Sequence, residues 1–264
     1  MLKFLFVIKK NLEIPSVIKE LEKKKEIKLI PVKNISKLKK EEIKNLTGIL
    51  VLGGDGTFLR AVPYAYKYDL PILGVNKGRF GFLTEVSLNE LPQVISAIRN
   101  NSLPLKERTL LKIHYNKQTF VALNEAAILK GPAGRLIYLE LKINKKNLTT
   151  IYGDGIIIAT PTGSTAYNVS AGGPIIHPEA KVFVCTPICS FKINLRPFII
   201  PDNYHIEINL KEIKEEIHLL IDGQINISFK DGHLIYIQKA EKTLKFFPSL
   251  EKDYFYILKE KFDW

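Results

Sequence analysis

The hydrophobic pattern of this 264-residue chain changes once, near residue 100, and this change limits the folds that the chain can adopt. Up to about residue 95, short apolar runs such as residues 3–8 and 49–52 alternate with segments of helical spacing such as residues 88–98. Short buried strands without polar alternation, separated by helices, are typical of a parallel sheet covered by helices. The first part of the chain is therefore predicted to be an α/β domain with a Rossmann-like parallel sheet.

After about residue 105 the chain has the pattern of strands joined by short turns. The strand-like segments are residues 110–115, 119–129, 136–143, 148–152, 181–187, 204–210, 217–221, 225–229 and 234–238. Many short strands with turn residues between them are typical of antiparallel sandwiches. One helix-like interruption is expected at residues 163–171, and helical spacing returns at residues 253–264. We therefore predict an all-β, sandwich-like second domain.

Composition excludes several classes of protein. Hydrophobic residues make up 46% of the chain and charged residues 25%, as in ordinary globular proteins. No apolar run approaches the roughly 18 residues of a membrane span, and the start MLKFLFVIKK becomes charged too early for a signal peptide. We expect a cytoplasmic protein without a membrane partner. The net charge of +12 favours phosphate-bearing ligands, but basic and aromatic residues are not interleaved as in nucleic-acid binders, so no nucleic acid is expected.

The segment 52-LGGDGTFLR-60 follows an apolar run directly and precedes a helical stretch. Glycines at the carboxyl end of a strand allow backbone N–H groups to approach an anion closely. A carboxylate in such a loop needs a task of its own, and Asp55 could bind a divalent cation or accept a proton from an attacking hydroxyl. The P-loop pattern is absent, and Leu59 stands where the third glycine of a dinucleotide fingerprint would be.

The stretch 153-GDGIIIATPTGSTAYNVSAGGPIIHP-178 is rich in glycine and poor in lysine. Its hydroxyl groups crowd at the predicted start of a short helix, where they suit a polar ligand. Small residues keep that helix slim, so that a planar ligand or another backbone could lie close to it. A helix cap with tight packing is the alternative interpretation.

These two stretches resemble known kinase signatures. The first resembles the GGDGT signature of NAD kinases, diacylglycerol and sphingosine kinases and phosphofructokinases, which indicates phosphoryl transfer and leaves the acceptor open. The second resembles the NAD kinase signature nearly residue for residue, and lipid kinases do not carry it in this form. Further matches are 74-GVNKGRFGFLTEV-86, 123-LNEAAI-128, 222-DGQ-224 and the terminal YF…LKEKF.W pattern. The chain is therefore identified as a member of the NAD kinase family, with a lipid kinase or a non-catalytic nucleotide sensor as alternatives.

The resemblance implies an activity and an organisation. The activity is phosphorylation of the 2′-hydroxyl of the adenosine ribose of NAD to give NADP, with ATP or polyphosphate as donor. Mg²⁺ or another divalent cation is expected to be held mainly by the donor phosphates, not by protein ligands alone. The implied assembly is a homodimer or homotetramer that binds small-molecule nucleotides. The implied domains are residues 1–100, an NAD-binding domain at 101–238, and a C-terminal segment at 239–264 that returns to the first domain.

The resemblance also implies roles for individual residues. Asp55 matches the proton acceptor, with Gly56 beside the substrate and Arg60 as a basic residue of the same loop. Asn124 and Glu125 match a pair that hydrogen-bonds the substrate. The other matching positions are Arg135 as a basic residue, Asp154 at the nicotinamide end, Thr165, Ala166, Tyr167 and Ser170 on the nucleotide-facing helix, Gln224 in the late turn, and Asn76 and Phe82 as second-tier candidates.

Some of these residues also have structural interpretations. Glu125 could be an outward-facing strand residue, and Arg135 could be an ordinary surface charge. The pair Asp222-Gly223 fits a hairpin turn, with Gln224 as its bystander. Gly153 departs from the family pattern, which commonly has a serine before the aspartate, and this puts local positioning in doubt but not the function.

Overall fold

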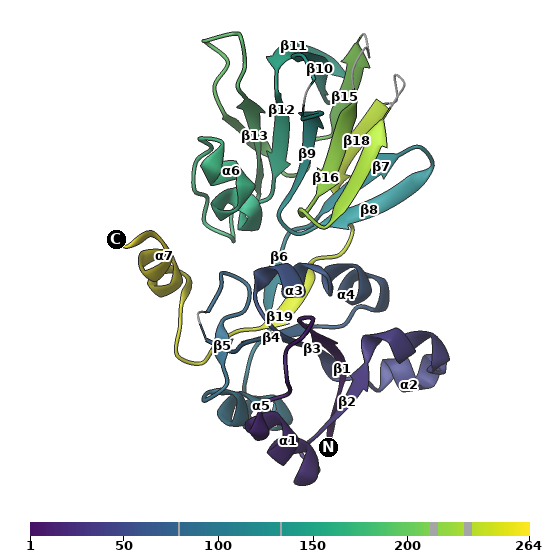
Figure 1. Cartoon of the computed structure of the whole chain (residues 1–264), viewed down its shortest axis with the longest axis vertical. Helices are drawn as coiled ribbons and strands as arrows, with labels where there is room; N and C mark the ends of the chain where they lie inside the picture. The colour runs from purple at the N-terminus through teal and green to yellow at the C-terminus, as the bar shows by residue number, and fades with distance from the viewer. Residues whose placement is uncertain (79, 133, 212–215, 230–233) are drawn as a thin grey trace. The chain divides into compact units, whose positions relative to one another are not determined.

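The computed structural model describes residues 1–78, 80–132, 134–211, 216–229 and 234–264 (Figure 1). The chain forms two compact units. The first, which we call the α/β unit, contains Met1–Glu107 and Leu244–Trp264, and the second, the β unit, contains Arg108–Thr243. The C-terminal segment therefore belongs to the first unit, which confirms the return of the chain that the resemblance implied. Arg79 of the matching segment 74–86 lies outside the described residues.

The α/β unit is built on one sheet of seven strands among the described residues. In spatial order these are β2 (Ile27–Pro31), β1 (Leu2–Ile8), β3 (Gly48–Leu52), β4 (Ile72–Asn76), β19 (Leu244–Phe247) and β6 (Lys106–Arg108), with β5 (Val86–Ser87) paired to β4. The pairs β1–β2, β1–β3, β3–β4, β4–β5 and β4–β19 are parallel, which confirms the predicted parallel sheet. The central strands β3 and β4 are buried along their whole length, as their uninterrupted apolar sequences require.

The same unit contains several helices among its described residues. They are α1 (Ser16–Lys23), η1 (Val32–Lys37), α2 (Lys40–Lys44), α3 (Asp55–Leu59), α4 (Val62–Tyr68), α5 (Leu91–Arg99) and α7 (Tyr254–Phe262). Several of them, such as α1 and α5, bury an apolar face. In α5, Leu91, Val94, Ile95 and Ile98 are buried, which is the spacing of one helix face. These side chains share a core cluster with Leu50 of β3 and Val75 of β4. No helix in the described ranges is long and apolar enough to span a bilayer.

The β unit consists of two six-stranded sheets in the part of the chain described. One sheet has the order β11 (Lys146–Gly153), β10 (Ile137–Ile143), β15 (Ile206–Lys211), β18 (Leu234–Lys239), β7 (Leu111–Tyr115) and β8 (Gln118–Ala122). The other has the order β14 (Phe198–Pro201), β13 (Val182–Ile188), β12 (Gly155–Ala159), β9 (Glu125–Lys130), β16 (Ile217–Ile221) and β17 (Ile225–Phe229). Neighbouring strands pair antiparallel, and side chains of both sheets form one core, as in the sandwich that the pattern predicted.

The expectation of one strand over residues 119–129 is wrong, because the chain changes sheets in the middle of that segment. β8 ends at Ala122 in one sheet and β9 begins at Glu125 in the other. Both halves have strand composition, so the break is invisible in the hydrophobic pattern. The helix predicted at residues 163–171 is likewise divided into η2 (Thr162–Thr165) and α6 (Tyr167–Ser170), because the backbone of Ala166 leaves the helical region.

Candidate active site

Asp55 follows β3 closely, and its carboxylate is bonded by another segment of the same unit. Oδ2 accepts the N–H of Phe82 at 2.9 Å. Oδ1 accepts the N–H groups of Leu83 at 3.0 Å and Thr84 at 3.1 Å, and also the Thr84 hydroxyl at 3.2 Å. A Cβ atom at Gly81 would overlap the carboxylate, so only glycine allows this approach. The half-buried Asp55 carboxylate therefore fixes the loop of residues 81–84.

Asn76, at the end of β4, supports the same loop. It is 3% exposed, and its amide nitrogen donates to the carbonyl oxygens of Thr84 at 3.0 Å and Val86 at 2.9 Å. The Phe82 ring lies 6.1 Å from that of Phe262 in α7, measured between centroids. The two second-tier candidates, Asn76 and Phe82, thus both lie within the structure that surrounds Asp55.

Two further candidates of the glycine-rich loop are solvent-exposed. Gly56 and Arg60 both face solvent, and the guanidinium of Arg60 donates to the carbonyl oxygen of Ile8 at 3.3 Å. A Cβ atom at Gly54 would meet open space. The loop therefore has an open side from which a ligand can reach its backbone.

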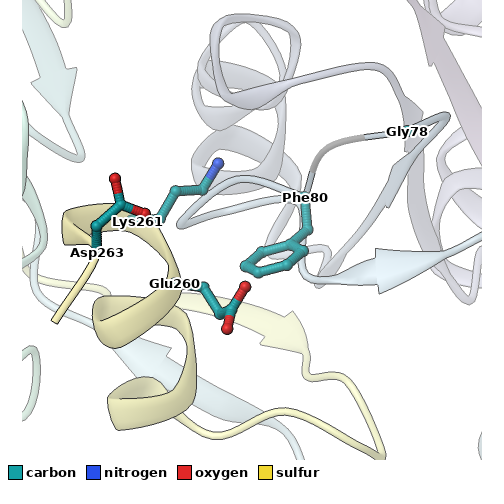
Figure 2. Close-up of a pocket in the computed structure, with 5 residues that line it drawn as sticks. All are labelled: Gly78, Phe80, Glu260, Lys261 and Asp263. Carbon is teal, nitrogen blue, oxygen red and sulfur yellow. The ribbon is translucent and has the colours of Figure 1, made fainter.

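A cleft of about 480 Å³ also lies in the α/β unit (Figure 2). It is lined by Gly78, Phe80, Glu260, Lys261 and Asp263. The ammonium of Lys261 lies 5.2 Å from the centroid of the Phe80 ring, so α7 and the segment after β4 meet here. None of the sequence-predicted site residues lines this cleft.

In the β unit, residues 123–125 form the turn between β8 and β9. The N–H groups of Leu123, Asn124 and Glu125 all donate to the carboxylate of Asp222, at 2.8, 2.7 and 3.1 Å. The Leu123 carbonyl accepts the Thr160 hydroxyl at 2.5 Å, and the Asn124 carbonyl accepts the Thr160 N–H at 2.8 Å. The Glu125 carbonyl accepts the N–H of Asp222 at 3.0 Å. Two residues distant in sequence therefore satisfy all six backbone groups of this turn.

The stretch 160–174 packs on this turn and is bonded within itself. The Thr160 hydroxyl also accepts the N–H of Gly163 at 3.1 Å, and a Cβ atom at Gly163 would overlap the Asn124 carbonyl. The buried Asn168 side chain donates to the carbonyl oxygens of Ser164 and Pro174, both at 3.0 Å. It also accepts the hydroxyl of Thr186 at 2.6 Å. Close packing within the protein is thus sufficient to explain Gly163 and the polar side chains of Thr160 and Asn168.

Glu125 is a buried acid whose side chain is only partly satisfied. It is 6% exposed, and its Oε2 has no hydrogen-bond partner among the described residues, which is also true of the Thr162 hydroxyl. Burial, and secondly the charge of Asp222, raise the pKa of Glu125 to about 8, although the Tyr167 N–H opposes this. Burial raises the pKa of Asp222 to about 6 against its three N–H bonds. Burial beside the Asp222 charge therefore favours the protonated form of the Glu125 carboxyl.

The remaining candidates of the β unit differ in their surroundings. The Asp154 carboxylate pairs with the Lys130 ammonium at 3.0 Å. Burial, then the charges of Cys189, Asp154 and Glu125, raise the pKa of the Tyr167 phenol, so these groups lie within electrostatic range of it. Thr165 and Ala166 are half-buried, with the Thr165 hydroxyl donating to the Thr162 carbonyl at 3.3 Å. The exposed candidates are Arg135, Tyr167, Ser170 and Gln224.

The sequence interpretation missed the roles of Asp222 and Thr160. Asp222 and Gly223 do form the expected hairpin turn, both with positive φ, but the Asp222 side chain is also the acceptor for residues 123–125. The available signal was the Asp-Gly pair itself, which is equally common in ordinary turns.

The described residues do not build a site for a resident metal ion. No group of three histidine, cysteine, aspartate or glutamate side chains within them could hold one. Asp55, which the sequence offered as a cation ligand, already accepts four hydrogen bonds.

A glycine-rich loop with a carboxylate, at a strand end of a parallel sheet, is the kind of place where open α/β sheets bind ligands, and it is consistent with a nucleotide-binding phosphotransferase. Comparison with known proteins shows the same class, because two domain models of NAD kinases match this chain. The sequence model of the ATP-NAD kinase N-terminal domain matches residues 8–103, and that of the ATP-NAD kinase C-terminal domain matches residues 123–249. The NAD kinase of Geotalea daltonii is 38% identical over 221 residues, which are 82% of this chain and 78% of that protein.

Two solved structures resemble the whole chain. An NAD kinase from Archaeoglobus fulgidus in complex with ATP has a TM-score of 0.75 at 28% identity, and the match covers 95% of each chain. A yeast NADH kinase complexed with NADH has the same fold, with a TM-score of 0.86 at 24% identity over 100% of this chain and 88% of that one. The chain belongs to the NAD kinase family. It is an enzyme that phosphorylates NAD, and the lipid kinase alternative is not supported.

Proposed function

We propose that Asp55 accepts the proton of the ribose 2′-hydroxyl while the terminal phosphoryl group of ATP is transferred to that oxygen. The hydrogen bonds of the Asp55 carboxylate carry this proposal. A carboxylate oxygen accepts about two hydrogen bonds. Oδ1 already accepts three, whereas Oδ2 accepts only the Phe82 N–H, so Oδ2 is the oxygen with room for a hydroxyl.

The same bonds hold the Asp55 carboxylate in a fixed direction, so it is a well-aimed acceptor. Aspartate side chains are in general poor bases for a hydroxyl. In a loose phosphoryl-transfer transition state the proton leaves late, so alignment matters more than basicity. Such help is worth roughly 10²–10⁴-fold in rate, or about 3–5 kcal/mol.

The glycine-rich loop is proposed to bind the donor phosphates. Gly54 is exposed and has open space where a side chain would be, so its backbone is accessible to an anion. Gly56 and Arg60 face solvent in the same loop. The donor is proposed to be ATP or polyphosphate that carries its own Mg²⁺ or another divalent cation.

The β unit is proposed to bind NAD through the turn at residues 123–125 and the packed stretch after it. Asn124 and Glu125 are proposed to hydrogen-bond the substrate, with Asp154 at the nicotinamide end. Thr165, Ala166, Tyr167 and Ser170 are proposed to lie along the nucleotide, with Arg135 and Gln224 as further contacts. The unpartnered Oε2 of Glu125 and hydroxyl of Thr162 support a polar ligand here, because buried polar groups normally have partners.

The family resemblance also leads us to propose a cytoplasmic homodimer or homotetramer. Size-exclusion chromatography with light scattering on the purified chain measures its mass directly. A monomeric mass at enzyme concentrations used in assays would contradict the proposed assembly.

Purified protein mixed with NAD, ATP and Mg²⁺ tests the function. NADP is detected with an NADP-specific dehydrogenase, and parallel reactions replace ATP with other triphosphates or polyphosphate. Omission of Mg²⁺ in the presence of a chelator should abolish NADP formation. If no NADP forms with any of these donors, the assignment is contradicted. NAD binding without NADP formation would favour the nucleotide-sensor alternative.

A further inference from the structure

Asp222 binds the backbone of the turn at residues 123–125, which is proposed to bind NAD. It is 7% exposed, and its carboxylate is occupied by the N–H groups of residues 123–125. We propose that Asp222 is a positioning residue that holds Asn124 and Glu125 in place for NAD and keeps the Glu125 side chain a hydrogen-bond donor. This inference rests on the proposed role of Asn124 and Glu125 in NAD binding.

The first part of the inference is geometric. A strand directs successive N–H groups to opposite sides, so three consecutive N–H groups reach one carboxylate only if the backbone turns. Asp222 is the acceptor that makes this turn possible where the chain crosses between sheets. Thr160 binds the carbonyl oxygens of Leu123 and Asn124, so it completes the turn and cannot replace the acceptor. Without Asp222, three N–H groups would lose their partner and the turn would relax.

The second part concerns the proton on Glu125. The titratable groups that face it are Asp222 at the end of β16 and Tyr167 in α6, whose backbone N–H bonds the Glu125 carboxyl. The neighbouring strand β12, Gly155–Ala159, presents only an apolar run, and Lys130 at the other end of β9 pairs with Asp154. A buried carboxyl beside a negative charge and away from cations retains its proton.

A protonated carboxyl donates one hydrogen bond through its O–H. Oε2 of Glu125 is the oxygen without a partner among the described residues, so a ligand atom at that position should be a hydrogen-bond acceptor. Ring nitrogens, ribose oxygens and the carboxamide oxygen of NAD have this character. Ionised Glu125 would repel the same atom, so NAD affinity should fall as Glu125 loses its proton.

Steady-state kinetics from pH 6 to 9 with three variants test this inference. Asp222→Asn should raise the KM for NAD about tenfold with a smaller effect on kcat, because one oxygen cannot accept all three N–H bonds. It should also shift the alkaline fall of kcat/KM toward lower pH, because Glu125 loses the neighbouring negative charge. Glu125→Gln, whose amide donates but does not ionise, should remove that alkaline fall.

Asp202→Asn is the matched control. Asp202 is also a buried carboxylate of the β unit, but its partner is the Lys239 ammonium at 2.6 Å. This variant should retain the KM and the alkaline fall of the parent enzyme. An unshifted profile in Asp222→Asn, or an alkaline fall that persists in Glu125→Gln, would overturn the inference.

The kinetic results distinguish a failure of the proposed function from a failure of the proposed role of Asp222. If the parent enzyme makes no NADP, the proposed function is contradicted. If the parent makes NADP but the pH profile of kcat/KM is unshifted in Asp222→Asn, only the proposed role of Asp222 is contradicted. If Asp222→Asn does not fold, as judged by circular dichroism, Glu125→Gln still tests whether Glu125 acts as a hydrogen-bond donor, because its amide keeps one acceptor and one donor.

Discussion

Asp55 in the α/β unit and Asp222 in the β unit make the same pattern of hydrogen bonds in different surroundings. Each carboxylate accepts three consecutive backbone N–H groups from a segment distant in sequence, residues 82–84 for Asp55 and 123–125 for Asp222. Asp55 is half-buried in an open, glycine-rich loop, whereas Asp222 is buried beside a second acid. The same arrangement thus leaves one carboxylate able to reach a substrate and confines the other to positioning.

The largest expected effect is a loss of kcat when Asp55 is replaced, because only Asp55 of the two carboxylates is proposed to accept the substrate proton. Asp55→Asn should lower kcat by roughly 10²–10⁴-fold and leave NAD affinity nearly unchanged. Its remaining oxygen can still accept the bonds from Leu83 and Thr84, so the variant removes Oδ2, which accepts the Phe82 N–H and has room for the hydroxyl. Rapid-quench kinetics and calorimetric NAD titration measure the two quantities.

Thr84→Val is the control for this experiment, because it removes one donor to Asp55 and leaves the carboxylate in place. Its kcat should stay within a few-fold of the parent value. A fall of less than tenfold in Asp55→Asn, or equal losses in both variants, would show that Asp55 acts by holding the loop and not by accepting a proton.

Stability should rank the two carboxylates in the opposite order. Asp222→Ala should lower the free energy of unfolding by about 3 kcal/mol, because it leaves three buried N–H groups without an acceptor. Asp55→Ala should cost about 1 kcal/mol, because water can reach its half-buried loop. Guanidinium unfolding of both variants gives the comparison, and equal losses would contradict it.

A smaller effect on kinetics is expected when alanine replaces either of two closely packed glycines. Gly163 packs against the turn at Asn124, and Gly81 packs against the Asp55 carboxylate. Gly163→Ala should raise the KM for NAD roughly tenfold, because it displaces the Asn124 carbonyl. Gly81→Ala should lower kcat by a similar factor, because it displaces the Asp55 carboxylate. Gly78→Ala, where a Cβ atom meets open space, is the control. Steady-state kinetics would contradict the assignment if the two effects were exchanged.

The smallest expected effect is the pH dependence of stability. The pKa of Glu125 is about 8 in the folded protein and near 4.5 when unfolded, so the folded state binds the extra proton between these values. Stability from this group is therefore complete below about pH 4.5 and is lost as pH rises through 8, by about 1 kcal/mol between pH 7 and 8. Urea unfolding should show this loss in the parent protein and not in Glu125→Gln. The same loss in both proteins would assign the pH dependence to other groups.

Much of the α/β unit could be predicted from the sequence because its signals are local. The uninterrupted apolar run of β3 and the glycines after it indicate a buried strand followed by an anion-binding loop, and Asp55 is found there. The hydrogen bonds of Asp55 to residues 82–84 were not predictable, since they join the segments that follow β3 and β4, two strands that become neighbours only in the folded sheet.

The β unit was harder to predict in detail. Its strands and turns were recognisable, and the turns at Asn116 and Asn144 have the positive φ values that their composition favours. The crossing between sheets at residues 123–125 was not recognisable, because both flanking segments have strand composition. Its stabilising acceptor, Asp222, lies 98 residues from Asn124 in sequence.

The sequence by itself determined the two-part organisation, the parallel sheet, the family and the presence of Asp55, Asn124 and Glu125 in recognisable motifs. Those features follow from hydrophobic period and from short stretches whose chemistry is contained in neighbouring residues. Only the tertiary structure decided that Asp222 binds the turn and that Glu125 is buried beside it, where burial and the Asp222 charge raise the pKa of Glu125. Both depend on burial and on contacts between distant segments, and burial sets the cost of a charge.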